Sequence, residues 1–151
     1  MPLEDFFQED GITRNVLETG EIVTHIQLPE NSADFIGSYQ KLRLREAWDF
    51  PEGGVAFSVG VSADGSVSTI NMASTGFESI PRKHKELIES LDKGPNWALE
   101  ADRLGAELKR AVRPVLNTWF PPAYRKKMAS VLARRAMAVS YTHLTLPTIA
   151  V

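Results

Sequence analysis

The stretch that decides the fold is VAFSVGVSADGSVSTINMA, residues 55–73. From Val55 to Val61 every second residue is valine or phenylalanine, which is the period of a strand with one buried face. The run Ala63–Ser66 contains Asp-Gly, a pair that tolerates the positive φ of a tight hairpin turn. Val67–Ala73 then resumes the strand pattern. These residues predict an antiparallel β-hairpin.

Two runs upstream of the hairpin also have a strand pattern. Ile22–Leu28 places Ile22, Thr24, Ile26 and Leu28 on one face of a strand, and Pro29 then ends the run. In Ser38–Leu44, Leu42 and Leu44 share one face, which we expect to point toward the core. Together with the hairpin, these runs predict a sheet of three or four antiparallel strands.

Beyond Gly76 the apolar spacing lengthens to the period of amphipathic helices. We expect three helices, over about Ser79–Leu91, Ala98–Val112 and Ala123–Met137. Because the strands come first and the helices follow without alternating, the pattern predicts an α+β fold. The expected architecture is a two-layer sandwich, in which the helices cover one face of the sheet.

The composition is that of a single soluble domain. The 151 residues are 43% hydrophobic and 24% charged, with a formal net charge of −2. This balance offers no general attraction to nucleic acid or anionic lipid, and no apolar run approaches the ~20 residues of a membrane-spanning helix. The chain has no cysteine, which excludes disulfides and thiolate ligands. We expect a cytoplasmic protein without membrane insertion.

The common catalytic signatures are absent from the sequence. The three histidines, His25, His84 and His143, are far apart and have no partner at metal-ligand spacing. The sequence contains no Gly-x-Ser-x-Gly motif and no Rossmann or P-loop glycine pattern. We therefore expect no catalytic residue, no metal site, and no tight binding of a dinucleotide by this chain alone.

The most distinctive charged residues lie around the predicted strand Ser38–Leu44. Its polar face carries a row of hydrogen-bond donors, namely Tyr39, Lys41, Arg43 and Arg45. Asp49 follows four residues after Arg45 and is available to hold its guanidinium. A face of this kind either meets water or recognises an anion or a carbonyl group.

The predicted third helix, AYRKKMASVLARRAM, has a basic side. Its apolar stripe consists of Tyr124, Met128, Val131 and Leu132, and its basic side of Lys126, Lys127 and Arg134. A basic patch for RNA is one interpretation, and a solvated face is the other. Arg135 falls inside the stripe, so we expect a buried charge that needs a carboxylate or carbonyl partner.

The end of the chain differs from the rest. Residues 139–151 carry no charged side chain apart from His143, and they show no cap or amphipathic period. Within them, SYTHLTLPTIAV (residues 140–151) resembles translated sequencing-adaptor read-through. We expect a non-native or disordered tail over 139–151 and a domain that comprises residues 1–138.

Three segments resemble, in chain order, the C-terminal domain of the FAD-binding subunit of molybdenum hydroxylases. They are PLEDFF…LETGEIVTHIQLP, SYQKLRLREAWDFPEGGVAFSVGV and AYRKKMASVLARRAM. The family includes carbon monoxide dehydrogenase, xanthine dehydrogenase and 4-hydroxybenzoyl-CoA reductase. The resemblance covers residues 2–138, and the strand with Tyr-x-Lys that leads to Arg-Glu-Ala-Trp-Asp-Phe carries it most specifically.

The resemblance implies that FAD is held by N-terminal domains preceding this one, and that this domain approaches the flavin ring. By position, it places Lys41 near a carbonyl of the ring and makes Arg45 and Asp49 the charged pair that borders it. It further implies that electrons pass from 2Fe–2S clusters through FAD to an acceptor, while a molybdopterin in another subunit oxidises the substrate. The implied partners are iron–sulfur and molybdopterin subunits and the N-terminal FAD-binding domain, and the fragment alone would be inactive.

Two other functions stay open at this point. A non-catalytic protein-interaction module of the same fold would keep the core and the third helix without needing Lys41 or Asp49. A nucleic-acid-binding domain would need a continuous basic face, which the acidic balance of the chain opposes. We therefore expect no nucleic-acid partner.

Overall fold

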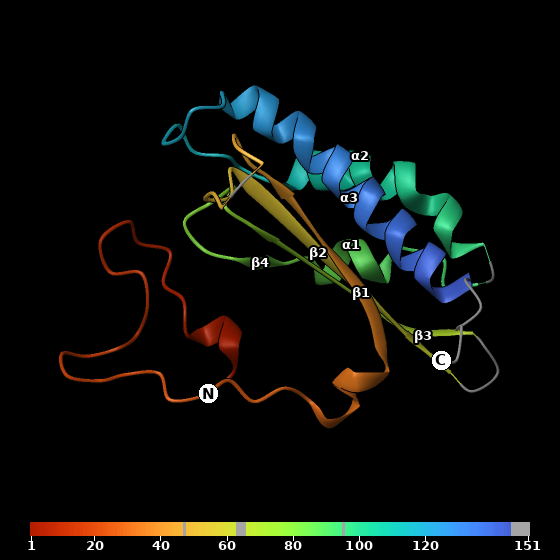
Figure 1. The fold of residues 1–151 in the computed structure, drawn as a ribbon, viewed down its shortest axis with the longest axis horizontal. Coiled ribbons are helices and arrows are strands. Elements are labelled where there is room, and N and C mark those ends of the chain that lie inside the picture. The colour runs from red at the N-terminus through yellow and green to blue at the C-terminus, as the bar shows by residue number, and fades with distance from the viewer. Residues whose placement is uncertain (47, 63–65, 95, 146–151) are drawn as a thin grey trace.

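The computed structural model describes residues 1–46, 48–62, 66–94 and 96–145. Over these residues it is the predicted α+β sandwich, a four-stranded antiparallel sheet with three α-helices on one side (Figure 1). The strands lie in the order β1-β2-β3-β4 and span Phe35–Leu42, Gly53–Val61, Val67–Thr75 and Arg82–Lys83. The helices are α1 (Lys85–Glu89), α2 (Ala101–Ala111) and α3 (Pro122–Thr145). Short 3-10 helices span Leu3–Asp5, Glu30–Asp34 and Trp97–Glu100.

The β2–β3 hairpin forms the centre of the sheet and confirms the prediction made from its alternating pattern. Phe57 pairs with Met72 and Val59 with Ile70 in an antiparallel register. The predicted Asp64-Gly65 turn lies outside the described residues. β1 pairs with the edge of β2 that β3 leaves free, and β4 pairs with the other edge of β3. Each hairpin strand therefore has a hydrogen-bonded neighbour on both sides.

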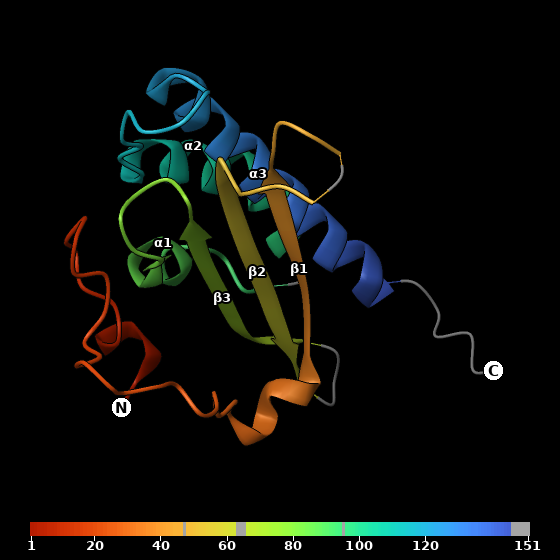
Figure 2. The ribbon, with the colours of Figure 1, turned by 60° about the vertical axis from the view of Figure 1, so that its left-hand side comes forward.

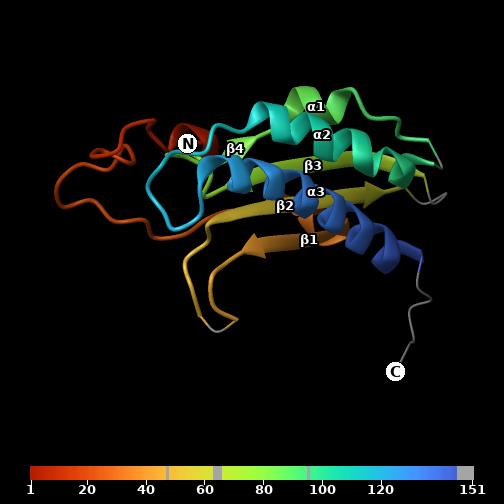
Figure 3. The ribbon, with the colours of Figure 1, turned by 90° about the horizontal axis from the view of Figure 1, so that it is seen from above.

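The helices cover one face of the sheet. α3 lies across β1 and β2, α2 packs beside α3, and α1 packs against β3 (Figure 3). The side chains between the layers are buried and include Val55, Phe57, Val59, Ile70, Met72, Leu104, Leu108, Leu132 and Met137. Removing this apolar surface from water is the main favourable contribution to folding, at about 25 cal/mol per Å².

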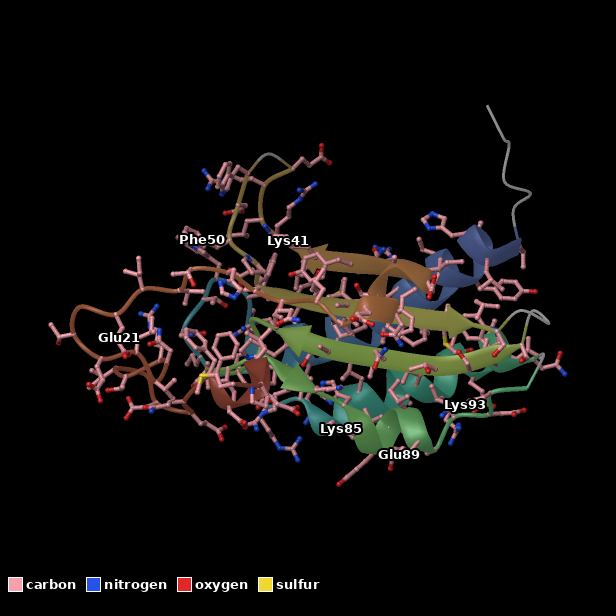
Figure 4. The ribbon with its side chains drawn as sticks, turned by 90° about the horizontal axis from the view of Figure 1, so that it is seen from below. Glu21, Lys41, Phe50, Lys85, Glu89 and Lys93 are labelled. Atoms are coloured by element: carbon pink, nitrogen blue, oxygen red, sulfur yellow. The ribbon has the colours of Figure 1, made fainter. Side chains whose placement is uncertain are left out.

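The other face of the sheet carries no helix and faces the viewer in Figure 4. We call it the open face; its side chains from the three long strands are mostly small and include Gly37, Gly54, Ala56, Ser58, Asn71 and Ala73. A groove of about 870 Å³ lies between this face and the N-terminal arm, residues 1–29, which contributes Leu3, Phe7 and Leu28 to its lining. The arm runs out to one side of the molecule (Figure 2).

The prediction of a strand over Ile22–Leu28 is wrong. This segment of the arm has no strand assignment, and Ile22 and Ile26 are 79% and 64% exposed. An alternating pattern forms a stable strand only when a neighbouring strand accepts and donates its backbone hydrogen bonds. Within the described residues no strand pairs with this segment.

Two predicted boundaries beside the sheet are also shifted. The helix expected from Ser79 begins only at Lys85, because Arg82 pairs as part of β4 with Ser74 of β3. Leu44 lies beyond the end of β1 and is 47% exposed, so only Leu42 of the predicted pair points into the core.

The third helix is longer than predicted. It continues to Thr145, Ser140 is completely buried, and the ring of Tyr141 lies edge-on to Trp97 with a centroid distance of 5.7 Å. Residues 139–145 are therefore ordered and the prediction of disorder is wrong for them, whereas a non-native origin of the tail stays a prediction. Residues 146–151 lie outside the described part. An uncharged helix end can be held by packing alone, which its polarity pattern does not reveal.

The buried arginine of α3 is Arg125, and the prediction for Arg135 is wrong. Arg125 is 0% exposed, whereas Arg135 lies on the exposed side of the helix. The buried side of α3 consists of Arg125, Ala129, Leu132, Ala133, Ala136, Met137 and Ser140. Alanines let the helix approach the sheet closely, and this rotates the buried side away from the stripe of larger residues.

We predict that truncation within α3 distinguishes packed from unpacked residues. Deleting residues 140–151 removes the buried Ser140 and the Tyr141 ring from Trp97. An aromatic pair contributes about 1 kcal/mol and each kcal/mol corresponds to about 2–4 °C, so Tm should fall by roughly 2–4 °C. Deleting only 146–151 is the control and should leave Tm unchanged in thermal unfolding. Equal Tm values for the two truncations would contradict the packing of Ser140 and Tyr141.

We predict a second contrast between the two arginines of α3. Replacing Arg125 with methionine leaves the buried Glu52 carboxylate and three backbone carbonyls without their partner and should destabilise the protein by about 3–5 kcal/mol. Arg135→Met, at an exposed position on the same helix, should change stability by no more than about 0.5 kcal/mol. The free energies of unfolding are compared by urea titration. Similar values for both variants would show that Arg125 is not the critical arginine.

Candidate functional site

The candidate site lies where β1 ends, in the Arg43–Pro51 loop that connects β1 to β2. Lys41 projects from the open face next to this loop, and Phe50 lies on the loop itself (Figure 4). Because side chains alternate along a strand, the register that sends Leu42 into the core sends Tyr39 and Lys41 to the open face.

Asp49 organises the loop through several hydrogen bonds to its carboxylate. Oδ2 accepts the backbone N–H groups of Leu44 and Arg45 at 3.2 and 3.0 Å, and Oδ1 accepts that of Phe50 at 2.9 Å. Oδ1 also pairs with Nη2 of Arg45 at 3.1 Å. These bonds, chiefly the one from the Arg45 guanidinium, lower the pKa of Asp49 to about 2. The carboxylate is therefore ionised and committed to holding the loop.

Lys41 is tied to the same loop. Its Nζ donates a hydrogen bond to the backbone carbonyl oxygen of Asp49, while the side chain stays exposed on the open face. The structure thus brings together Lys41, Arg45 and Asp49, the three residues singled out from the sequence. Arg45 is the outermost of them, with 72% of its side chain exposed against 10% for Asp49.

Tyr39 and Gly54 extend the site along the open face. The Tyr39 hydroxyl lies 3.2 Å from Oγ1 of Thr75, so the ring reaches across Gly54 of the intervening strand. A Cβ at Gly54 would collide with the Tyr39 hydroxyl and lie 2.9 Å from Oγ1 of Thr75, so the Tyr39 ring lies over this position because glycine has no side chain. This part of the open face is therefore formed by the Tyr39 ring, and Lys41 lies two residues further along the same face of β1.

This arrangement fits one edge of a planar, carbonyl-bearing ring such as flavin. The exposed ammonium of Lys41 is a donor for a carbonyl, and the exposed ring of Tyr39 on the same face offers an aromatic surface beside it. The phosphates of a dinucleotide need a different site, because the chain lacks a glycine-rich loop at a helix N-terminus. The residues present therefore fit the ring of such a cofactor and offer no site for its phosphates of the glycine-rich-loop kind.

The described residues hold no group of three or more His, Asp or Glu side chains placed for a metal ion. None of the described helices is long and apolar enough to cross a membrane. On the basic side of α3, Arg134 pairs with Asp102 of α2 at 3.0 Å, and Lys127 is exposed.

Sequence reasoning missed Arg125 and Glu52, which lie directly beneath the loop. Arg125 Nε donates to the backbone carbonyl of Glu52 at 2.7 Å, and the Glu52 carboxylate is itself buried. The signal that could have revealed Arg125 is the row of alanines at helical spacing after it, at positions 129, 133 and 136.

The fold of this chain recurs in solved structures of molybdenum hydroxylases. Reconstituted CO dehydrogenase from Oligotropha carboxidovorans matches 91% of the chain with a TM-score of 0.74 and 24% identity. Carbon monoxide dehydrogenase from Hydrogenophaga pseudoflava matches 92% at a TM-score of 0.73 and 19% identity. Quinoline 2-oxidoreductase from Pseudomonas putida 86 matches 94% at a TM-score of 0.76 and 14% identity.

These likenesses define a shared fold at low sequence identity. The chain spans about half of each neighbour, 47–48% of the matched chain. No protein-family model matches the sequence. The class that the comparisons establish is therefore an α+β domain of the kind found in molybdenum hydroxylases.

We predict that Asp49 makes stability depend on pH. Its pKa in the folded state, about 2, lies below the usual 3.8, so its contribution is present above the usual value and is lost as pH falls toward 2. The stability difference between the wild type and Asp49→Asn should be constant above about pH 5 and shrink steadily below it. Urea titrations between pH 2.5 and 7 measure this difference.

The matched variant for this experiment is Arg45→Met. Because Arg45 makes the largest contribution to lowering the pKa of Asp49, this variant should retain only part of the pH dependence. A stability difference between wild type and Asp49→Asn that stays constant down to pH 2.5 would contradict the assigned hydrogen bonds.

Proposed function

We propose that this chain is part of the FAD-containing subunit of a molybdenum hydroxylase-type oxidoreductase, in which Lys41, Arg45 and Asp49 border the flavin ring. The observation that carries the proposal is the convergence of these three residues on one loop beside the open face of the sheet. The fold shared with CO dehydrogenase and quinoline 2-oxidoreductase supports it.

FAD, when bound to the complete subunit, would supply the redox chemistry by accepting electrons and passing them to an acceptor. Lys41 would place a positive charge near a ring carbonyl, and Asp49 would hold the loop through its bonds to Arg45 and the backbone. Since reduction adds negative charge to the ring, a nearby ammonium stabilises the reduced form more than the oxidised form.

The proposal includes partners and a location. An N-terminal FAD-binding domain would hold the phosphates, for which this chain has no glycine-rich loop. Iron–sulfur and molybdopterin subunits would deliver the electrons, with the whole assembly in the cytoplasm.

The test is the reduction potential of the flavin in a polypeptide that joins this chain to an N-terminal FAD-binding domain. Lys41→Met should make the flavin harder to reduce by tens of millivolts, where ~30 mV corresponds to ~1.4 kcal/mol for two electrons. Stability should barely change, because Lys41 is exposed.

Lys127→Met provides the matched control, since Lys127 is an exposed lysine on α3 in the helix layer, away from the open face. It should leave the potential unchanged. If Lys41→Met also leaves the potential unchanged, Lys41 is a solvated strand lysine and the flavin assignment fails. A non-catalytic interaction module of the same fold would then be the better explanation.

A further inference from the structure

The guanidinium of Arg125 joins three separate segments of the chain. Its Nε donates to the carbonyl oxygen of Glu52 at 2.7 Å, its Nη1 to that of Val115 at 2.6 Å, and its Nη2 to that of Gly76. Nη1 also lies 3.4 Å from Oδ1 of Asn117. These acceptors belong to the β1–β2 loop, the end of β3 and the α2–α3 connection, so one side chain fixes all three.

Arg125 acts here mainly as a hydrogen-bond donor. Oε2 of Glu52, 4.0 Å from Nε, has no hydrogen-bond partner, so the carboxylate compensates the charge without a direct bond. Burial lowers the pKa of Arg125 and the nearby Glu52 carboxylate opposes this effect. The planar fork of arginine reaches several carbonyls at once, which the single ammonium of a lysine does not reproduce.

The segment that Arg125 holds is the base of the candidate site. Glu52 closes the Arg43–Pro51 loop, because its N–H donates to the carbonyl of Leu42 at 2.8 Å while its carbonyl accepts from Arg125. Gly76, with φ at 72°, packs so tightly that a Cβ would lie 3.0 Å from the Pro51 carbonyl oxygen. The end of the loop is therefore held from below by α3 and from the side by the end of β3.

We propose that Arg125 is a positioning residue for the candidate site: by holding Glu52 it sets the conformation of the Arg43–Pro51 loop and so places Lys41 and Asp49 for the flavin. The last step rests on the proposed function, whereas control of the loop does not. Arg125 is 0% exposed, so it acts through the loop alone.

The first measurement uses the 151-residue chain without flavin. The pKa of Asp49, about 2 in the wild type, reports whether the loop keeps its hydrogen bonds, and side-chain carbon NMR measures it directly. Arg125→Lys keeps the positive charge but loses the planar guanidinium, and Arg125→Met loses both. In each variant we expect the proton affinity of Asp49 to rise at least tenfold. Arg135→Lys and Arg135→Met, exposed on the same helix, should leave it unchanged.

An Asp49 pKa that stays at about 2 in either folded Arg125 variant would overturn the proposal. If neither variant folds, Arg125 serves stability alone and the proposal is equally overturned. A loss of stability accompanied by a shifted Asp49 pKa, with both Arg135 controls unchanged, supports it.

The second measurement uses the flavin-containing polypeptide and separates the two proposals. Arg125→Lys should lower the flavin potential in the same direction as Lys41→Met, and the double variant should show no additional shift. A shifted Asp49 pKa with no effect of Lys41→Met on the potential supports loop positioning and rejects the flavin role. If the Asp49 pKa does not shift in the Arg125 variants but Lys41→Met lowers the flavin potential, the flavin role is supported and loop positioning is rejected.

Discussion

The structure depends on a buried guanidinium that must find acceptors. A charge removed from water is tolerated only when it is paired or hydrogen-bonded, and Arg125 meets this requirement where three chain segments present their carbonyls to α3. The Ala-rich side of α3 brings the arginine to this point by allowing the helix close to the sheet. The requirement fixes the helix layer and the ends of β2 and β3 relative to one another.

The two faces of the sheet carry different side chains because the helices cover only one of them. The covered face buries large side chains such as Phe57 and Met72, whereas the open face carries small residues such as Gly54 and Ala56. Lys41 lies at the end of the open face, next to a loop whose backbone N–H groups bond to the Asp49 carboxylate. The rigid core thus supports a charged, exposed loop, an arrangement common at binding sites.

Much of this architecture follows from local pattern. The β2–β3 hairpin and the α2 and α3 helices are readable because alternation and helical spacing are properties of neighbouring residues. The closeness of Lys41, Arg45 and Asp49 follows from their separation by only a few residues around one turn of the chain. The Ile22–Leu28 segment shows the limit of such reasoning, since its alternation has no partner strand among the described residues.

The sequence by itself determined the α+β class, the central hairpin and the identity of the charged residues in the β1–β2 loop. Tertiary structure alone decided that Arg125 is buried and Arg135 exposed, and that α3 extends to Thr145 through the packing of Ser140 and Tyr141. The physical reason is the range of the interactions. Periodicity reports which side of an element is apolar, whereas the partners of a buried charge are backbone carbonyls 10 to 73 residues away, which carry no mark in the sequence.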